Sequence, residues 1–213
     1  MIEIIPAILA KTKEEFTEMV ARVAPHAEWV HVDIMDGTMT ADKTGVMPED
    51  LENFNPNLQF ELHLMTSQPM VYMTEWLATD AARICVHVEA EDVVEAIERI
   101  KSAGRSAGLA MNPKTELDAM REFLPMVDYV QFMTVHPGQY GGEFVQGVLE
   151  KINKFHIDHP QVIIAVDGAI HEGTAQVAVS AGATRLILGS HIFSEGRDIG
   201  EAIAELKESL DKL

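Results

Sequence analysis

Short apolar runs and amphipathic stretches alternate along the whole chain. Runs rich in Val, Ile and Leu are typical of buried parallel strands, and they lie near residues 2–8, 28–33, 59–64, 84–88, 107–111, 128–134, 162–167 and 185–188. Apolar positions three or four residues apart predict helices between them, such as 13–23, 93–102, 115–123, 144–155, 173–179 and 199–210. Eight strands with short connections within 213 residues predict the α/β class, as one (β/α)₈ barrel domain over residues 1–213.

Local signals support this alternation and mark one interruption. Asp92 and Thr115 are suited to cap the starts of two helices, and Gly104 and Gly182 lie where two helices should end. The segment from 37 to 54 shows neither the strand pattern nor the helix pattern, so we expect a long irregular loop there. Long loops on the catalytic face of a barrel usually serve function.

Four polar residues lie at or near the ends of apolar runs: His31, Asp33, His63 and Asp167. In barrels, ligands bind outside the carboxyl ends of the strands, and a polar group there is costly unless it has a role. A period of two places His31 and Asp33 on the same face of one strand. Each residue alone would be explained by an ordinary hydrogen bond. Together they form a mixed nitrogen and oxygen set suited to one divalent ion, with Zn²⁺ favoured over Fe²⁺, Mn²⁺ and Co²⁺.

A second His/acid pair, His87 and Glu89, ends another run. The two residues could be further ligands, but we favour a buried hydrogen-bonded pair beneath the site.

Glycine-containing turns follow the last three strands. They comprise Gly138, Gly141 and Gly142 in the segment 136–142, then Gly168 and Ala169, then Gly189 and Ser190. In barrels, the loops after the seventh and eighth strands often bind phosphate through exposed backbone amides. Four methionines, Met35, Met65, Met111 and Met133, fall near strand ends and are expected either to fill the core or to line a water-excluding pocket.

Charge and composition narrow the class of ligand. Sixteen basic against thirty-four acidic residues give a net charge of −18, which excludes a nucleic-acid partner. A phosphorylated substrate would then depend on backbone N–H groups for local positive potential. The single cysteine, Cys85, and the lack of a signal-peptide pattern or a long apolar run predict a cytoplasmic protein without membrane contact. Whether it forms a homo-oligomer stays open.

Taken in order, these motifs resemble those of the ribulose-phosphate 3-epimerase family. The resemblance covers essentially the whole chain and is most specific at 31–37 (His-Val-Asp-Ile-Met-Asp-Gly) and 62–65 (Leu-His-Leu-Met); it also includes 6–9, 86–90, 112–113, 133–138, 166–168 and 189–190.

The resemblance implies a divalent metal held by His31, Asp33, His63 and Asp167. It also implies that Asp33 and Asp167 are the two acid/base groups. The methionines Met35, Met65 and Met133 match those that line the family's substrate pocket. The implied reaction inverts C3 of a ketose phosphate, D-ribulose 5-phosphate to D-xylulose 5-phosphate, by two-base proton transfer through an enediolate.

The chain departs from the family pattern around the substrate. Ala7 stands where the family usually has Ser, Ala169 replaces a glycine, and Tyr140 displaces the paired glycines Gly141 and Gly142 by one position. Two alternatives therefore stay open. One is an epimerase of a six-carbon ketose phosphate, and the other is a barrel that binds a sugar phosphate without turning it over.

Overall fold

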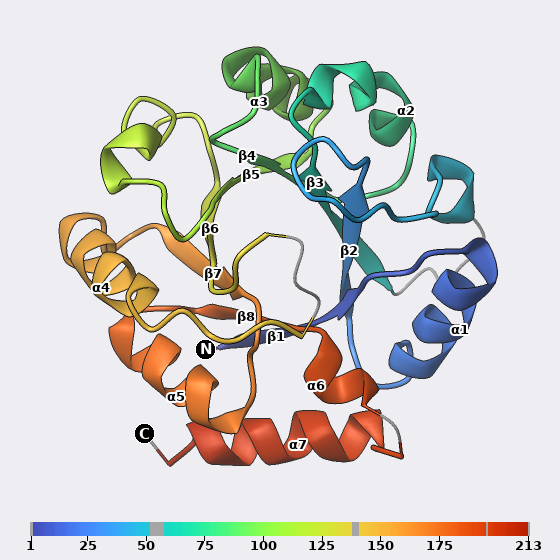
Figure 1. Cartoon of the computed structure of the whole chain (residues 1–213), viewed down its shortest axis with the longest axis vertical. Coiled ribbons are helices and arrows are strands. Elements are labelled where there is room, and N and C mark those ends of the chain that lie inside the picture. Colours follow the sequence, from blue (N-terminus) through green and yellow to red (C-terminus); the bar gives the residue numbers. More distant parts are fainter. Residues whose placement is uncertain (1, 52–57, 138–140, 195, 213) are drawn as a thin grey trace.

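The described strands of this protein close into one parallel barrel (Figure 1). The computed structural model describes residues 2–51, 58–137, 141–194 and 196–212. The strands follow the sequence order, and the last one pairs with the first. They are β1 (Glu3–Ile8), β2 (Trp29–Met35), β3 (Gln59–Met65), β4 (Arg83–His87), β5 (Ser106–Met111), β6 (Tyr129–Met133), β7 (Ile163–Asp167) and β8 (Arg185–Leu188). The predicted (β/α)₈ barrel is confirmed.

Helices surround this barrel on the outside (Figure 1). The α-helices are α1 (Lys13–Val23), α2 (Met73–Leu77), α3 (Val93–Ser102), α4 (Val148–Asp158), α5 (Glu172–Ala181), α6 (Ser190–Phe193) and α7 (Ile199–Leu210), and the 3₁₀ turns are η1 (Pro48–Leu51), η2 (Pro69–Val71) and η3 (Leu117–Met120). In the part of the chain that the structure describes, no helix has the length and apolar character needed to cross a bilayer.

Two predicted helices differ from the structure, both because of contacts with the barrel. The segment 115–123 contains only the 3₁₀ turn η3, since the Thr115 hydroxyl binds Glu89 instead of capping a helix. Helix α4 begins at Val148 rather than near 144, because the N–H of Val145 donates to the carbonyl of Thr134 after β6. Asp92 does occupy the N-cap position of α3, but its side chain makes no capping bond.

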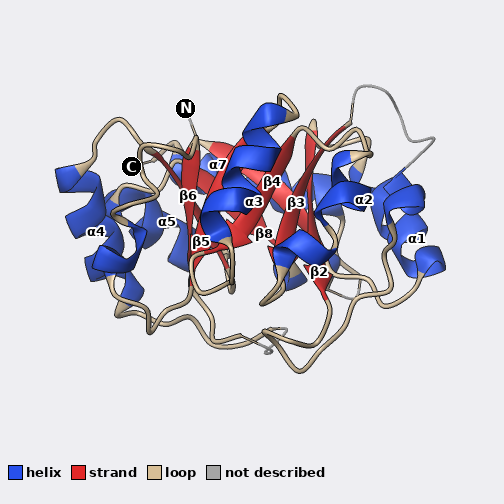
Figure 2. Cartoon of the chain, turned by 90° about the horizontal axis from the view of Figure 1, so that it is seen from above, coloured by secondary structure: helices blue, strands red, loops and turns tan. Residues whose placement is uncertain are grey.

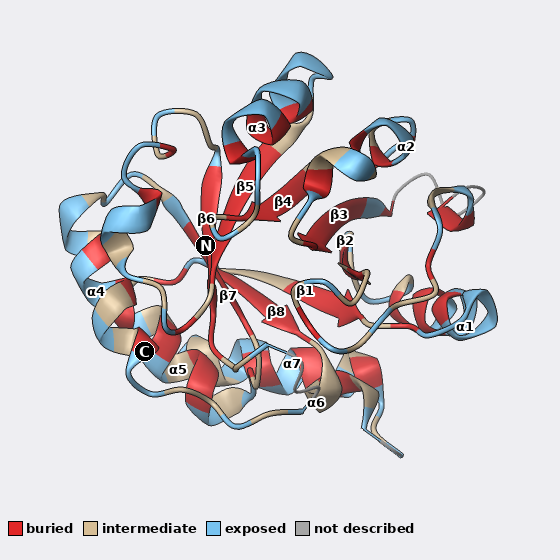
Figure 3. Cartoon of the chain, turned by 45° about the horizontal axis from the view of Figure 1, so that its top comes forward, coloured by how far each residue is buried: buried red, intermediate tan, exposed pale blue. Residues whose placement is uncertain are grey.

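The core consists of two clusters of buried residues. Buried positions lie along the strands and on parts of the surrounding helices (Figure 3). The larger cluster lies between the barrel and the helices, where α1 buries Phe16, Met19, Val20 and Val23. The smaller fills the barrel interior with Ala7, Cys85, Ala110, Tyr129, Ala165 and Ile187. The Tyr129 ring fits because Gly108 has no side chain: a Cβ there would lie 2.2 Å from Tyr129 Cζ.

Long loops gather along one edge of the barrel (Figure 2). The predicted irregular loop after β2 holds a single bridge between Asp36 and Lys43, then η1; its residues 52–54 lie outside the described residues. Gly45 in this loop packs so tightly on the chain before α1 that a Cβ would lie 2.1 Å from the carbonyl oxygen of Lys11. The loop is therefore fastened beside the carboxyl ends of the strands, where the site lies.

Candidate metal and active site

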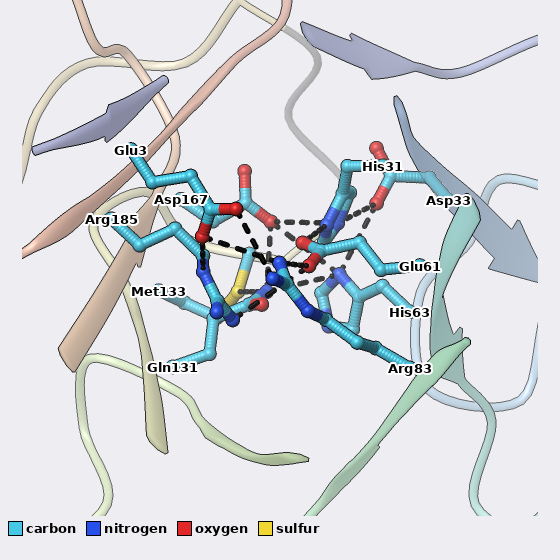
Figure 4. Close-up of polar contacts among 10 residues, drawn as sticks. All are labelled: Glu3, His31, Asp33, Glu61, His63, Arg83, Gln131, Met133, Asp167 and Arg185. Carbon is cyan, nitrogen blue, oxygen red and sulfur yellow. Dashed lines mark hydrogen bonds and ion pairs between the residues drawn. The ribbon is translucent and has the colours of Figure 1, made fainter. Parts of the chain in front are cut away.

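The barrel brings together the four polar residues predicted to share one site. Strand register pairs Asp33 of β2 with His63 of β3, while Asp167 closes β7 beside Met133. One ligand atom from each of His31, Asp33, His63 and Asp167 lies within 4.8 Å of all the others (Figure 4). Both imidazoles are fully buried and both carboxylates nearly so.

The spacing of these atoms suits a single cation. His31 Nε2 lies 3.3 Å from Asp33 Oδ1 and 3.6 Å from Asp167 Oδ2. His63 Nδ1 lies 3.1 Å and 3.4 Å from the same two oxygen atoms. A divalent ion about 2.1 Å from each of four tetrahedral ligands would space the ligand atoms about 3.4 Å apart. The donor set and its dimensions therefore fit a divalent metal.

The orientation of His31 also fits a metal ligand. Its Nδ1 lies 2.7 Å from Glu61 Oε1, and a carboxylate only accepts, so Nδ1 carries the proton. In the neutral ring, the form that binds a metal, the second nitrogen Nε2 is a lone pair aimed at the cluster. This buried atom has no hydrogen-bond partner among the described residues. A buried acceptor without a hydrogen-bond partner lowers the stability of the fold unless a ligand binds to it.

Glu61 belongs to an ion network at the amino end of the barrel (Figure 4). Arg83 Nη1 donates to Glu61 Oε2 over 3.1 Å, and Arg185 Nη1 lies 3.7 Å from the same oxygen. Glu3 bridges the two guanidinium groups at 3.1 Å and 2.6 Å. Because every charge has an opposite partner, the buried Glu61 carboxylate can remain ionised and hold His31.

The carboxyl group of Asp33 is held in its charged form. Burial alone would raise its pKa, but the imidazoles of His31 and His63 outweigh burial and lower the pKa below the ordinary value. Asp33 is therefore an acceptor of protons or of a cation at neutral pH.

A pocket opens above the cluster and includes most of the predicted substrate residues. It is lined by Asp33 and Asp167 and by Met35, Met65, Met133, Gly141, Gly168, Ala169, Gly189 and Ser190. Gly142 does not line the pocket, and Gly138 lies outside the described residues. Met111 is buried in the layer facing the helices, because its position in β5 places it on the outer face of the barrel.

The turn after β7 is built on two residues with positive φ. Gly168 has a φ of 117°, and a Cβ there would lie 2.6 Å from a methyl group of Val135, so only glycine fits. Ala169 follows with a φ of 50°, a left-handed conformation that costs a non-glycine residue about 1–2 kcal/mol. The chain thus tolerates local strain in this turn at the pocket wall.

Several residues at the site were not predicted from the sequence. Asp42 and His136 line the pocket from loops, where no strand pattern marked them. Gln131 lies buried inside β6 and donates from Nε2 to Asp167 Oδ2 over 3.0 Å. A polar residue at an inward-facing strand position was the available signal for Gln131 and also for Glu61.

His87 and Glu89 form the predicted hydrogen-bonded pair rather than further ligands, but only His87 is buried and Glu89 is exposed. His87 Nδ1 lies 3.0 Å from Glu89 Oε2, and the group that could hold a metal among the described residues does not include either side chain. His87 Nε2 instead faces His63 Nε2 at 2.8 Å.

The fold and the cluster together define a barrel enzyme whose strand ends could hold one divalent ion. The ribulose-phosphate 3 epimerase family model matches residues 3–193, so the chain belongs to that family, whose members are isomerases. It is 31% identical to "Ribulose-5-phosphate-3-epimerase, chloroplastic" of Arabidopsis thaliana over 96% of this chain and 75% of that protein. It is 30% identical to "Ribulose-phosphate 3-epimerase" of Bacillus subtilis, over 98% of this chain and 100% of that protein.

Solved structures show the same fold at lower identity. The 3-hexulose-6-phosphate synthase of Salmonella typhimurium superposes with a TM-score of 0.73 at 15% identity, covering 99% of both chains. At that identity the likeness concerns the barrel alone.

Proposed function

We propose that this protein is a divalent-cation-dependent epimerase that inverts C3 of D-ribulose 5-phosphate to give D-xylulose 5-phosphate. The observation that carries the proposal is the convergence of Asp33 and Asp167 on one point, together with the two imidazoles. The names of the relatives from Arabidopsis thaliana and Bacillus subtilis support the choice of substrate. The nitrogen and oxygen ligand set favours Zn²⁺ among the divalent ions.

Inversion at a carbon beside a ketone needs one group to remove a proton and another to return it on the opposite face. Asp33 on β2 and Asp167 on β7 approach the cluster from different sides of the barrel (Figure 4). One carboxylate takes the C3 proton, and the other group, protonated, delivers one to the opposite face of the enediolate. The two exchange roles when the substrate has the other configuration.

The surrounding residues hold this arrangement in place. His31 and His63 would bind the cation together with the two carboxylates. When bound, the cation supplies electrostatic stabilisation of the charge that develops on the substrate oxygen atoms. Met35, Met65 and Met133 line the pocket with apolar surface that excludes water from the reacting carbon.

The phosphate would lie on the other side of the pocket, against the turns after β7 and β8. The described residues that line the pocket include no Lys or Arg, so backbone N–H groups, together with side chains such as that of Ser190, would bind the phosphate. The turns at 168–169 and 189–190 bring such groups to the pocket wall, with Gly141 beside them. In a chain of net charge −18 these amides supply the local attraction. A reducing cytoplasm remains our prediction for its location.

The test is to follow Zn²⁺-loaded protein by NMR in deuterated water with a panel of five- and six-carbon ketose phosphates. We expect deuterium to enter at C3 of D-ribulose 5-phosphate with formation of D-xylulose 5-phosphate. Asp167→Asn keeps the shape of the side chain but removes one acid/base group. It should lower inversion by at least about 10²–10⁴-fold, the usual contribution of a general acid or base.

The outcomes separate the candidate functions. If only a six-carbon ketose phosphate undergoes deuterium exchange and inversion at C3, that compound is the substrate instead of D-ribulose 5-phosphate. Neither reaction with any member of the panel, in protein that retains Zn²⁺, would favour a binding protein without turnover. Inversion by Asp167→Asn at the wild-type rate would refute the two-base mechanism.

A further inference from the structure

A chain of hydrogen bonds runs from the back of His63 to the loop that follows β5. His63 Nε2 lies 2.8 Å from His87 Nε2, and the two buried rings are nearly parallel, with 14° between their planes. His87 Nδ1 lies 3.0 Å from Glu89 Oε2. The other oxygen, Oε1, accepts the N–H of Asn112 over 2.8 Å and the hydroxyl of Thr115. None of these contacts belongs to the pocket itself.

The far end of this chain is firmly anchored. Lys151 Nζ donates to the carbonyl oxygens of Pro113 and Thr115 over 2.8 Å and 2.6 Å, which fastens the loop that holds Glu89. Burial by itself would raise the pKa of Glu89, but hydrogen bonds from His87 and Thr115 hold it at about 2. Glu89 is therefore an ionised acceptor in a fixed position.

The positions of the protons follow by elimination. A carboxylate only accepts, so the proton between His87 and Glu89 belongs to His87 Nδ1. A neutral His87 then has a lone pair on Nε2, which can only accept a proton from His63 Nε2. In a neutral His63 ring, the form that binds a cation, this leaves Nδ1 as the lone pair. Nδ1 faces Asp33 and Asp167, and without a cation it lies within hydrogen-bond distance of Asp33 Oδ1. If His87 carried its proton on Nε2 instead, the lone pair of its Nδ1 would face the Glu89 carboxylate, and two acceptors repel each other.

We infer that Glu89 and His87 are positioning residues that place the proton of His63 on Nε2 and so present Nδ1 to the cation. They would do for His63 what Glu61 does for His31. The inference rests on the cation dependence proposed above. It adds that the affinity of the site for the cation is set partly from outside it, by a carboxylate that touches neither cation nor substrate.

The sharpest test is Glu89→Gln, because the new side chain has the same shape. The N–H of Asn112 can only donate, so the amide oxygen of the glutamine should take the place of Oε1. Its NH₂ group would then face His87 Nδ1 and stabilise the lone pair there. The proton of His87 would move to Nε2, and His63 would have to carry its own proton on Nδ1, inside the cation site.

The matched control is Glu91→Gln, which removes the same charge two residues away. Glu91 is exposed, and its side chain accepts only from Gln68 among the described residues. Wild type and both variants would be labelled with ¹⁵N-histidine, and long-range ¹H–¹⁵N spectra of the metal-free proteins would assign the tautomer of His87. Zn²⁺ affinity would be measured by competition with a chromogenic chelator.

We expect an Nδ1–H tautomer of His87 in the wild type and in Glu91→Gln, and an Nε2–H tautomer of His87 in Glu89→Gln. The Zn²⁺ affinity of Glu89→Gln should fall about 10–100-fold, as expected for a partner of a metal ligand. Equal melting temperatures of the two variants would show that both are folded. An unchanged tautomer in Glu89→Gln, or an affinity within twofold of the control, would overturn the inference alone. Wild-type protein that binds no Zn²⁺ would overturn the proposed function, and this inference with it.

Discussion

Replacing Glu61 by Gln tests whether the ion network at the amino end of the barrel stabilises the fold and orients the site. The Glu61 side chain is fully buried and meets three charged or polar partners: His31 at 2.7 Å, Arg83 at 3.1 Å and Arg185 at 3.7 Å. Gln keeps the shape but removes the charge. His31 loses a charge-assisted bond, and the two guanidinium groups share only Glu3.

The magnitude follows from this geometry. Breaking a buried ion pair by removing one partner typically costs about 3–5 kcal/mol. Glu3 still pairs with both arginines, and Gln can accept one hydrogen bond, so we expect about 3 kcal/mol, the lower end of that range. For a chain of this size, 1 kcal/mol lowers the melting temperature by about 2–4 °C, which gives a loss of about 6–12 °C.

The pH dependence provides a second, independent check. Burial alone would raise the pKa of Glu61, but His31, Arg185 and Arg83 outweigh it, and the pKa lies below its ordinary value of 4.5. A depressed carboxyl pKa contributes stability that is present above the ordinary pKa and is lost as pH falls through the folded one. The difference between wild type and Glu61→Gln should therefore be full at pH 7 and narrow below about pH 4.

The assay is thermal unfolding followed by circular dichroism in the presence of a chelator. Glu208→Gln on α7 is the control, because its side chain is 74% exposed and should change stability by less than about 0.5 kcal/mol. If Glu61→Gln melts within about 1 °C of this control, the network does not stabilise the fold as argued.

Two further predictions concern the interior and the substrate. Gly108→Ala should destabilise the protein by about 3 kcal/mol in chemical denaturation, because its Cβ would collide with the buried Tyr129 ring. Gly147→Ala is the control, because a Cβ there meets open space and should not destabilise the protein. Equal denaturation midpoints for the two variants would contradict the packing argument. D-ribulose without its phosphate should be epimerised at least about 100-fold less efficiently in kcat/KM than its 5-phosphate, since remote binding energy is spent at the reacting carbon; equal efficiencies would remove the phosphate from the proposed function.

The sequence by itself determined the barrel and the four residues at its centre. Buried parallel strands read as continuous apolar runs, and the predicted strand limits lie within two residues of those in the structure. His31, Asp33, His63 and Asp167 stand out because a polar group ending such a run is unusual. The period of two within a strand, and the shared edge of parallel strands, then place the four together.

The tertiary structure decided what holds those residues and which loops reach them. Glu61 lies 30 residues from His31 along the chain, His87 lies 24 residues from His63, and Glu89 lies 26 residues from Thr115. No local pattern gives the direction of a side-chain nitrogen. Asp42 and His136 come to the pocket on loops whose path is set by contacts such as that of Gly45 with Lys11. Helical periodicity likewise misplaced the start of α4, because a backbone bond to the end of β6 outweighs local preference. Periodicity fixes which face of an element is buried, whereas proton positions and loop paths depend on contacts between segments distant in the chain.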